Sequence, residues 1–120
     1  MDAYNKFLNL FQGISKLDKF PTMTPLSRLI LDQISLHQAQ GKLLTVKEMI
    51  GFKEIASPAT LHKHLTSLRS SGYVSATSDG NDKRTKHLLL TSLGYLYVKN
   101  LSQAIVQAAT PDDNIKSKAR

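Results

Sequence analysis

A capped helix followed directly by a β-hairpin constrains the fold more than any other feature of this chain. Ser57 and Pro58 have the order of a helix N-cap and first helical residue, and Gly72 supplies a stop. Three leucines between them share one helical stripe: Leu61, Leu65 and Leu68. The apolar spacing then changes, which predicts a helix over about 57–71 and a β-hairpin over about 73–90.

The predicted hairpin has a turn-forming tip and a basic returning strand. Residues 73–77 include an aromatic and two β-branched residues, and residues 78–82 contain only Ser, Asp, Gly and Asn. Apolar residues return over 85–90. Three basic residues lie just beyond the tip: Lys83, Arg84 and Lys86.

Two helices are predicted directly before this segment. Thr24 and Pro25 begin one of them, and Gly41 stops it. Its inner face is expected to carry four residues: Leu26, Leu29, Ile30 and Ile34. Thr45 and Glu48 have the spacing of a capping box, which predicts a short helix directly after them.

The two terminal helices are unusually apolar. The first follows Asp2 and is expected to end at Phe20-Pro21. Its apolar stripe has five members: Tyr4, Phe7, Phe11, Ile14 and Leu17. The last helix is capped by Thr91 and runs to about Ala109, with apolar residues on more than one face. A small winged core cannot cover both helices, so we expect a two-fold symmetric homodimer.

Taken in order, these elements predict a mainly α fold with a small β-hairpin wing, a winged helix-turn-helix. Residues 1–41 form N-terminal supporting and dimerisation helices, and residues 42–91 form the DNA-binding core. Residues 92–109 form the C-terminal dimerisation helix. Residues 110–120 are polar and are expected to be disordered.

Charge favours a polyanionic partner. The net charge is +7, and residues 42–91 hold eight Lys and Arg against four Asp and Glu. Such a segment suits double-stranded DNA, although a solubilising surface explains the charge equally well. The absence of cysteine excludes disulfides and thiolate chemistry and fits a cytoplasmic protein. Neither a signal peptide nor a membrane-spanning apolar run is evident.

The helix over 57–71 carries small polar and basic residues away from its leucines. Five of them are candidates for contact with the DNA major groove: Ser57, Thr60, His62, Lys63 and Ser67. The alternative for each is an ordinary solvated helix face.

No catalytic, metal or cofactor site is predicted. His62 and His64 are two residues apart and do not share a helix face, while His37 and His87 lack a partner at ligand spacing. Phosphate-binding, dinucleotide-binding and nucleophile-elbow motifs are missing from the sequence. We therefore expect a protein that is not an enzyme.

Over residues 45–98 the chain resembles the MarR family of bacterial regulators. The pattern His64-Leu65-x-x-Leu68-x-x-x-Gly72-Tyr73-Val74 is similar to that family's end of the recognition helix and start of the wing. The run from Asp79 to Thr91 is similar to its wing signature, a spaced pair of aspartates with basic residues before the strand and the Leu-Thr start of the next helix.

The resemblance implies roles for the wing. Asp79 and Asp82 would brace it, and Arg84 would reach the minor groove or its phosphates, with Lys83 and Lys86 beside it. The alternative is a simple hairpin turn in which Arg84 pairs locally with Asp82. The resemblance also implies a homodimer built from the terminal helices. Many family members release DNA when a small ligand binds, but the sequence names no effector.

Two classes of function remain open. The first is sequence-specific regulation of transcription by a dimer that binds double-stranded DNA. The second is a winged-helix module that binds protein, or a replication or partition accessory that binds DNA without regulating a gene. The basic wing and the polar helix favour DNA but do not separate a regulator from an accessory.

Overall fold

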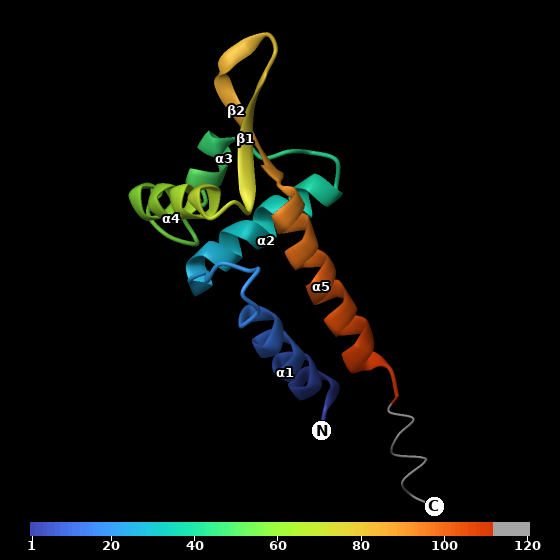
Figure 1. Cartoon of the computed structure of the whole chain (residues 1–120). Coiled ribbons are helices and arrows are strands. Elements are labelled where there is room, and N and C mark those ends of the chain that lie inside the picture. Colours follow the sequence, from blue (N-terminus) through green and yellow to red (C-terminus); the bar gives the residue numbers. More distant parts are fainter. Residues whose placement is uncertain (112–120) are drawn as a thin grey trace, which may run out of the picture. The chain divides into compact units, whose positions relative to one another are not determined.

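The computed structural model describes residues 1–111, with the side chains of Asp79 and Lys83 excepted (Figure 1). Most of the tail predicted over 110–120 therefore lies outside the described residues. The elements in chain order are α1 (Ala3–Ser15), α2 (Pro25–Ala39), α3 (Val46–Ile50), α4 (Pro58–Ser70), β1 (Val74–Asp79), β2 (Asp82–Leu90) and α5 (Ser92–Ala109). This order confirms the predicted mainly helical fold with one antiparallel hairpin.

The chain divides into two compact units. One runs from Pro21 to Leu96, and the other combines Met1–Phe20 with the chain from Tyr97 onward. In the first unit α2 packs against α4 and β2, and α3 packs against the same two elements. Helix α2, grouped with the first helix in the sequence analysis, thus lies in the same compact unit as the helix-turn-helix and the wing.

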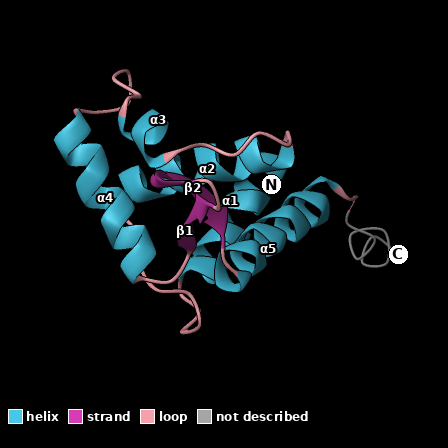
Figure 2. Ribbon diagram, turned by 90° about the horizontal axis from the view of Figure 1, so that it is seen from above, coloured by secondary structure: helices cyan, strands magenta, loops and turns pink. Residues whose placement is uncertain are grey.

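The winged unit is built around a continuous apolar core. Figure 2 shows the helices α2, α3 and α4 around the base of the hairpin. The buried side chains that fill this space are Ile30, Leu31, Ile34, Leu44, Met49, Leu61, Leu65, Leu68, Tyr73, Val74 and Leu88. The predicted leucine stripe of α4 is confirmed, since all three of its members are buried.

Helix α2 begins and ends as predicted but presents a different face. The Thr24 hydroxyl accepts a hydrogen bond from the Ser27 backbone N–H at 3.0 Å, and Gly41 has a φ of +81° just beyond the helix. Leu29 was expected inside, yet it is 51% exposed, whereas Leu31 is 1% exposed. The buried positions are 27, 30, 31 and 34, a complete i, i+3, i+4, i+7 set that leaves position 29 outside.

The hairpin is regular at its base and irregular near its tip. Val74 pairs with Leu90 and Ser78 with Lys86, but the next pair joins Asp79 to Asp82, so the register shifts there. Beside the base of β2, the Leu88 N–H donates to the Leu44 carbonyl at 2.8 Å. The wing is thereby fastened to the loop before α3.

The start of α5 lies tightly against the end of α4. Gly72 has a φ of +89°, and Tyr73 after it is fully buried, with its hydroxyl donating to the Pro21 carbonyl. The Tyr73 carbonyl accepts the Thr91 N–H at 3.0 Å. A Cβ atom added to Gly94 would lie 2.2 Å from the same carbonyl oxygen. Only glycine allows this approach of the two backbones.

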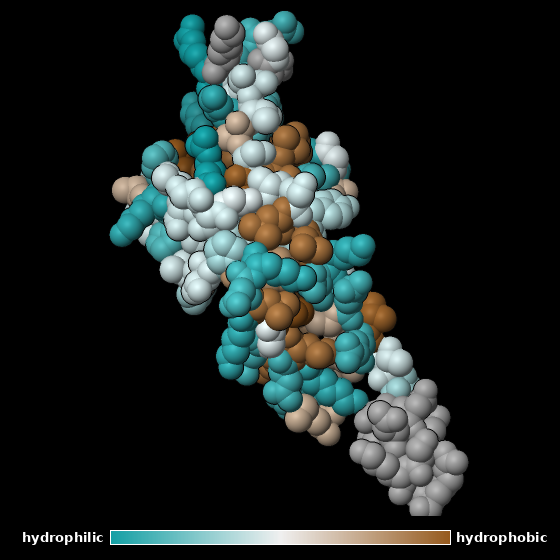
Figure 3. All heavy atoms as spheres, in the orientation of Figure 1, coloured by the Kyte–Doolittle hydropathy of each residue, from teal (hydrophilic) through white to brown (hydrophobic). Residues whose placement is uncertain are grey.

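The terminal unit leaves apolar side chains uncovered. None of the residues of α1, all of which the structure describes, is buried. This helix ends at Ser15, not at Phe20 as predicted, because the chain turns there and Lys16 donates to the Gly13 and Ile14 carbonyls. On α5, Ile105 is 56% and Val106 is 66% exposed. Figure 3 shows apolar side chains at the surface where these helices lie.

Candidate nucleic-acid interface

The N-terminus of α4 is held by its own hydroxyl groups. Ser57 accepts a hydrogen bond from the Thr60 N–H at 3.3 Å and donates its hydroxyl to the Thr60 Oγ1 at 2.9 Å. Two of the predicted contact residues are therefore joined to each other at the first turn. This N-cap fixes where the helix begins, and Ser57 is exposed beside its N–H groups.

The face of α4 opposite the buried leucines is polar and open. His62, Lys63 and Ser67 are exposed, and Thr60 is half-buried at the edge of this face. The structure adds two exposed residues that sequence reasoning did not select: Ala59 and Thr66. At 3.6 residues per turn, Ala59, Lys63, Thr66 and Ser67 point away from the leucine stripe. This surface combines hydrogen-bonding groups, one lysine and a methyl group.

His64 ties α4 to the start of α2. Its Nδ1 lies 3.1 Å from the Thr24 Oγ1 and 3.3 Å from the Ser27 Oγ. Ser27 is the buried polar residue of α2, at 2% exposure. The contact spans some forty residues of sequence, so neither the spacing nor the type of these residues signals it. It holds the polar face of α4 in one orientation on the core.

The wing tip is organised by Asp82. One carboxylate oxygen accepts the backbone N–H of Arg84 at 3.0 Å, and the other accepts the Thr85 hydroxyl at 2.8 Å. The Thr85 hydroxyl and then the Arg84 N–H lower the pKa of Asp82. The structure thus joins Asp82 to the backbone of Arg84, and the role of Asp82 as a brace for DNA contact stays a prediction.

The basic side chains of the wing are available to a partner. Arg84 and Lys86 are exposed, and the hairpin that carries them extends beyond the helices of its unit (Figure 1). The side chains of Asp79 and Lys83, also predicted as wing residues, lie outside the part that the structure describes. The pairing of the two strands shifts register between Ser78 and Asp79, beside the part of β2 that carries these residues.

Over residues 1–111, no group of three or more His, Cys, Asp or Glu side chains gathers as metal ligands would. Within the same residues, no helix has both the length and the apolar character needed to cross a membrane.

The chain is similar to several solved structures, among them a transcriptional regulator and a protein–DNA complex. Regulator Tm0710 from Thermotoga maritima matches with a TM-score of 0.59 and 18% identity, over 82% of this chain and 63% of that one. The S. aureus MepR–DNA complex matches with a TM-score of 0.61 and 18% identity, over 98% of this chain and 83% of that one. S. aureus MepR bound to ethidium bromide matches with a TM-score of 0.64 and 19% identity, over 97% of this chain and 83% of that one. This chain thus spans less than two thirds of the Thermotoga protein.

Comparison of sequences adds nothing to these structural matches. No known family and no curated protein matches the chain. At below 25% identity, the agreement with the solved structures concerns the course of the backbone. The chain therefore has the winged helix-turn-helix fold that the order of its elements predicted.

Proposed function

We propose that this protein is a transcriptional regulator that binds double-stranded DNA as a homodimer. The observation that carries the proposal is the exposed polar face of α4, which stands opposite a fully buried leucine stripe in the same compact unit as a basic hairpin. A helix with this surface fits the major groove, where base edges differ. The fold of the MepR–DNA complex supports the same reading.

The two elements have different tasks in this proposal. On α4, Lys63 donates to guanine or to a phosphate, while Thr60 and Ala59 offer methyl groups to thymine. On the wing, Arg84 and Lys86 contact phosphates or the minor groove. Contacts from α4 choose the sequence, whereas contacts from the wing mainly add affinity.

Dimerisation is proposed from the terminal unit. Helix α1 has no buried residue, and α5 exposes Ile105 and Val106. Two-fold pairing would cover this surface and place two α4 helices on a near-palindrome with half-sites about 10 base pairs apart. Sedimentation that finds only monomer at micromolar concentration, or a selected site without dyad symmetry, would contradict the dimer.

The main test selects bound sequences from random duplexes and then compares variants on the selected site. Lys63→Ala should lose roughly 1–3 kcal/mol of binding free energy on that site if it makes a base contact. Lys99→Ala removes another exposed lysine, from α5, and is the control once sedimentation shows the same oligomeric state as the wild type. If the two variants bind alike, α4 is not the reading helix.

The wing is tested by salt dependence. Arg84→Ala should weaken specific and non-specific duplexes alike and reduce the salt slope by about one unit. Asp82→Ala should also weaken binding, because the backbone of Arg84 loses its anchor, although simple electrostatics predicts the opposite sign. Tighter DNA binding by Asp82→Ala would show that Asp82 does not support DNA contact by the wing. A wild-type protein without salt-dependent duplex binding would instead be a protein-interaction module.

The proposal includes a small ligand that alters DNA binding. Its support is that MepR, which shares this fold, has also been solved with ethidium bromide bound. The chemistry and location of such a ligand in this chain are a separate question.

A further inference from the structure

The row of side chains directly opposite the buried leucines of α4 combines two methyl groups with one cation. At 3.6 residues per turn, Ala59, Lys63 and Thr66 follow one another along the middle of the polar face. All three are exposed. His62 and Ser67 lie to either side of this central row. In a helix-turn-helix the outward face of the second helix meets the base edges, so the central row is the part of α4 that faces them.

Two hydroxyl groups of this face already donate their hydrogens within the helix. The Thr66 hydroxyl donates to the His62 carbonyl at 2.9 Å. The Ser57 hydroxyl donates to the Thr60 Oγ1, also at 2.9 Å. Neither of them can donate the same hydrogen to a base. Thr66 therefore offers a partner its methyl group, as Ala59 does with its single side-chain carbon.

Helix α4 lacks the side chains that pair best with adenine and cytosine. Between Pro58 and Ser70 the sequence contains no Asn, Gln, Asp or Glu. Carboxamides bind adenine through two hydrogen bonds, and carboxylates accept from the amino group of cytosine. A lysine donates to guanine, and an apolar group contacts the 5-methyl group of thymine. The central row is therefore matched to thymine at its two ends and to guanine between them.

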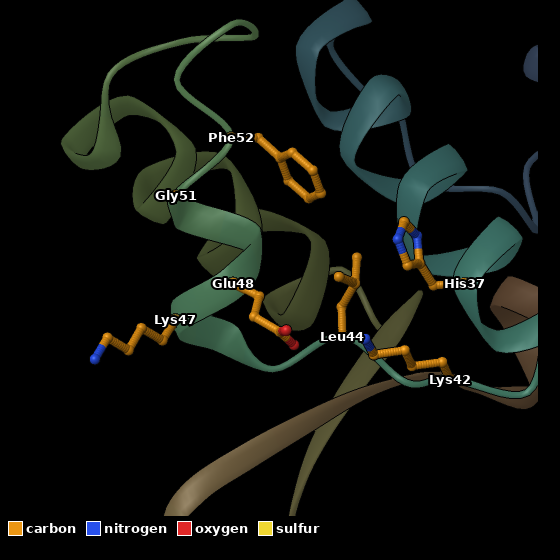
Figure 4. Close-up of a pocket in the computed structure, with 7 residues that line it drawn as sticks. All are labelled: His37, Lys42, Leu44, Lys47, Glu48, Gly51 and Phe52. Carbon is orange, nitrogen blue, oxygen red and sulfur yellow. The ribbon is translucent and has the colours of Figure 1, made fainter.

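Contacts with α2 hold the central row in one direction. The His64 Nδ1 lies 3.3 Å from the Oγ of Ser27, the buried serine of α2. In the connection that leads to α4, the Phe52 ring faces the His37 ring of α2, with centroids 6.3 Å apart (Figure 4). The helix is thus oriented on the core before DNA binds, and little conformational freedom is lost on binding.

We infer, building on the proposed function, that α4 recognises the methyl groups of two thymines about three base pairs apart, with a guanine between them. Ala59 and Thr66 are seven residues apart, which is about 10 Å along the helix axis. At about 3.4 Å per base pair, a helix that lies along the groove covers about three base pairs over this distance. Ala59 contacts one methyl group and Thr66 the other, while Lys63 donates to the guanine.

Replacement of thymine by deoxyuridine tests this contact, because uracil keeps the base pair and lacks only the 5-methyl group. The duplex is the site selected from random sequences, and its affinity is measured by fluorescence anisotropy at fixed salt. Deoxyuridine at either of the two thymines should weaken binding about three- to fivefold, as for one buried carbon group. The same replacement at a thymine outside both half-sites is the matched control and should leave the affinity unchanged.

Two protein variants assign each methyl contact. Thr66→Ser keeps the hydroxyl and removes the methyl, so it should abolish the effect of deoxyuridine at one thymine only. Thr110→Ser is the matched control, because Thr110 is also exposed and its hydroxyl also donates four residues back, to the Val106 carbonyl. Ala59→Gly should abolish the effect at the other thymine. Circular dichroism checks that each variant is folded, and the measured quantity is the ratio of the affinities for the two duplexes.

Selected half-sites without two thymines at this spacing would overturn the inference. So would an absence of any effect of deoxyuridine. An equal loss in the wild type, Thr66→Ser and Ala59→Gly would also overturn it, because the methyl groups would then act through the shape of the DNA. All three results would leave the regulator in place. A protein that selects no duplex at all would reject the proposed function itself and the thymine contacts with it.

Discussion

Gly94 offers the sharpest test of how α5 begins. Replacing a helical glycine by alanine can raise or lower the free energy of unfolding, depending on the space around the added methyl group. In an ordinary helix, Gly→Ala stabilises a protein by about 0.5–1 kcal/mol. At Gly94 the new Cβ would lie 2.2 Å from the Tyr73 carbonyl oxygen and 3.2 Å from its carbon. Both neighbours are backbone atoms, so no side chain can rotate away. The carbonyl or the first turn of α5 must move.

That movement has a second cost. The same carbonyl accepts the Thr91 N–H at 3.0 Å, and a hydrogen bond of this kind contributes about 1 kcal/mol. Overpacking costs about 1–3 kcal/mol. After the helix-propensity gain is subtracted, Gly94→Ala should lower the free energy of unfolding by about 2 kcal/mol.

The assay is urea unfolding followed by circular dichroism, at one protein concentration for all variants. Gly13→Ala is the matched control, because Gly13 is also helical and has no atom within 4 Å of an added Cβ. It should stabilise by about 0.5–1 kcal/mol. Equal effects of the two substitutions, or a gain in stability from Gly94→Ala, would refute the close approach of α5 to Tyr73.

Three further predictions concern the register of α2, the support of α4 and the wing. In the same unfolding assay, Leu31→Ala should lower the free energy of unfolding by about 2–5 kcal/mol and Leu29→Ala by under about 1 kcal/mol. The reverse order would show that the buried face of α2 is the one predicted from the sequence. His64→Ala should lower the free energy of unfolding by about 1–2 kcal/mol and weaken duplex binding, whereas His62→Ala should change stability little. Equal stabilities of the two variants would contradict the contact between His64 and α2. The pKa of Asp82 is lowered in the fold. Its carboxylate therefore contributes to the stability of the fold above the ordinary aspartate pKa of about 4, and this contribution is lost as pH falls through the lower folded value. Acid unfolding curves should therefore show a larger loss below about pH 4 for the wild type than for Asp82→Asn, and parallel curves would contradict this.

The candidate site could be predicted in its elements but not in its contacts. The polar residues of α4 and the basic residues of the wing follow from the position of a leucine stripe and a turn. The link from His64 to Thr24 and Ser27 does not, because it joins residues that only packing brings together. The same holds for the ring contact between His37, at the end of α2, and Phe52, beyond α3.

Local residue patterns are enough to predict where most helices begin and where the hairpin turns. Helix caps at Thr24, Thr45 and Ser57 are hydrogen bonds between residues three apart, so the spacing of residue types is enough to predict them. The tertiary structure alone decided which face of α2 is buried, where α1 ends and how β2 bulges. Those outcomes depend on the packing of distant segments and on their backbone hydrogen bonds, whose energies no local pattern contains.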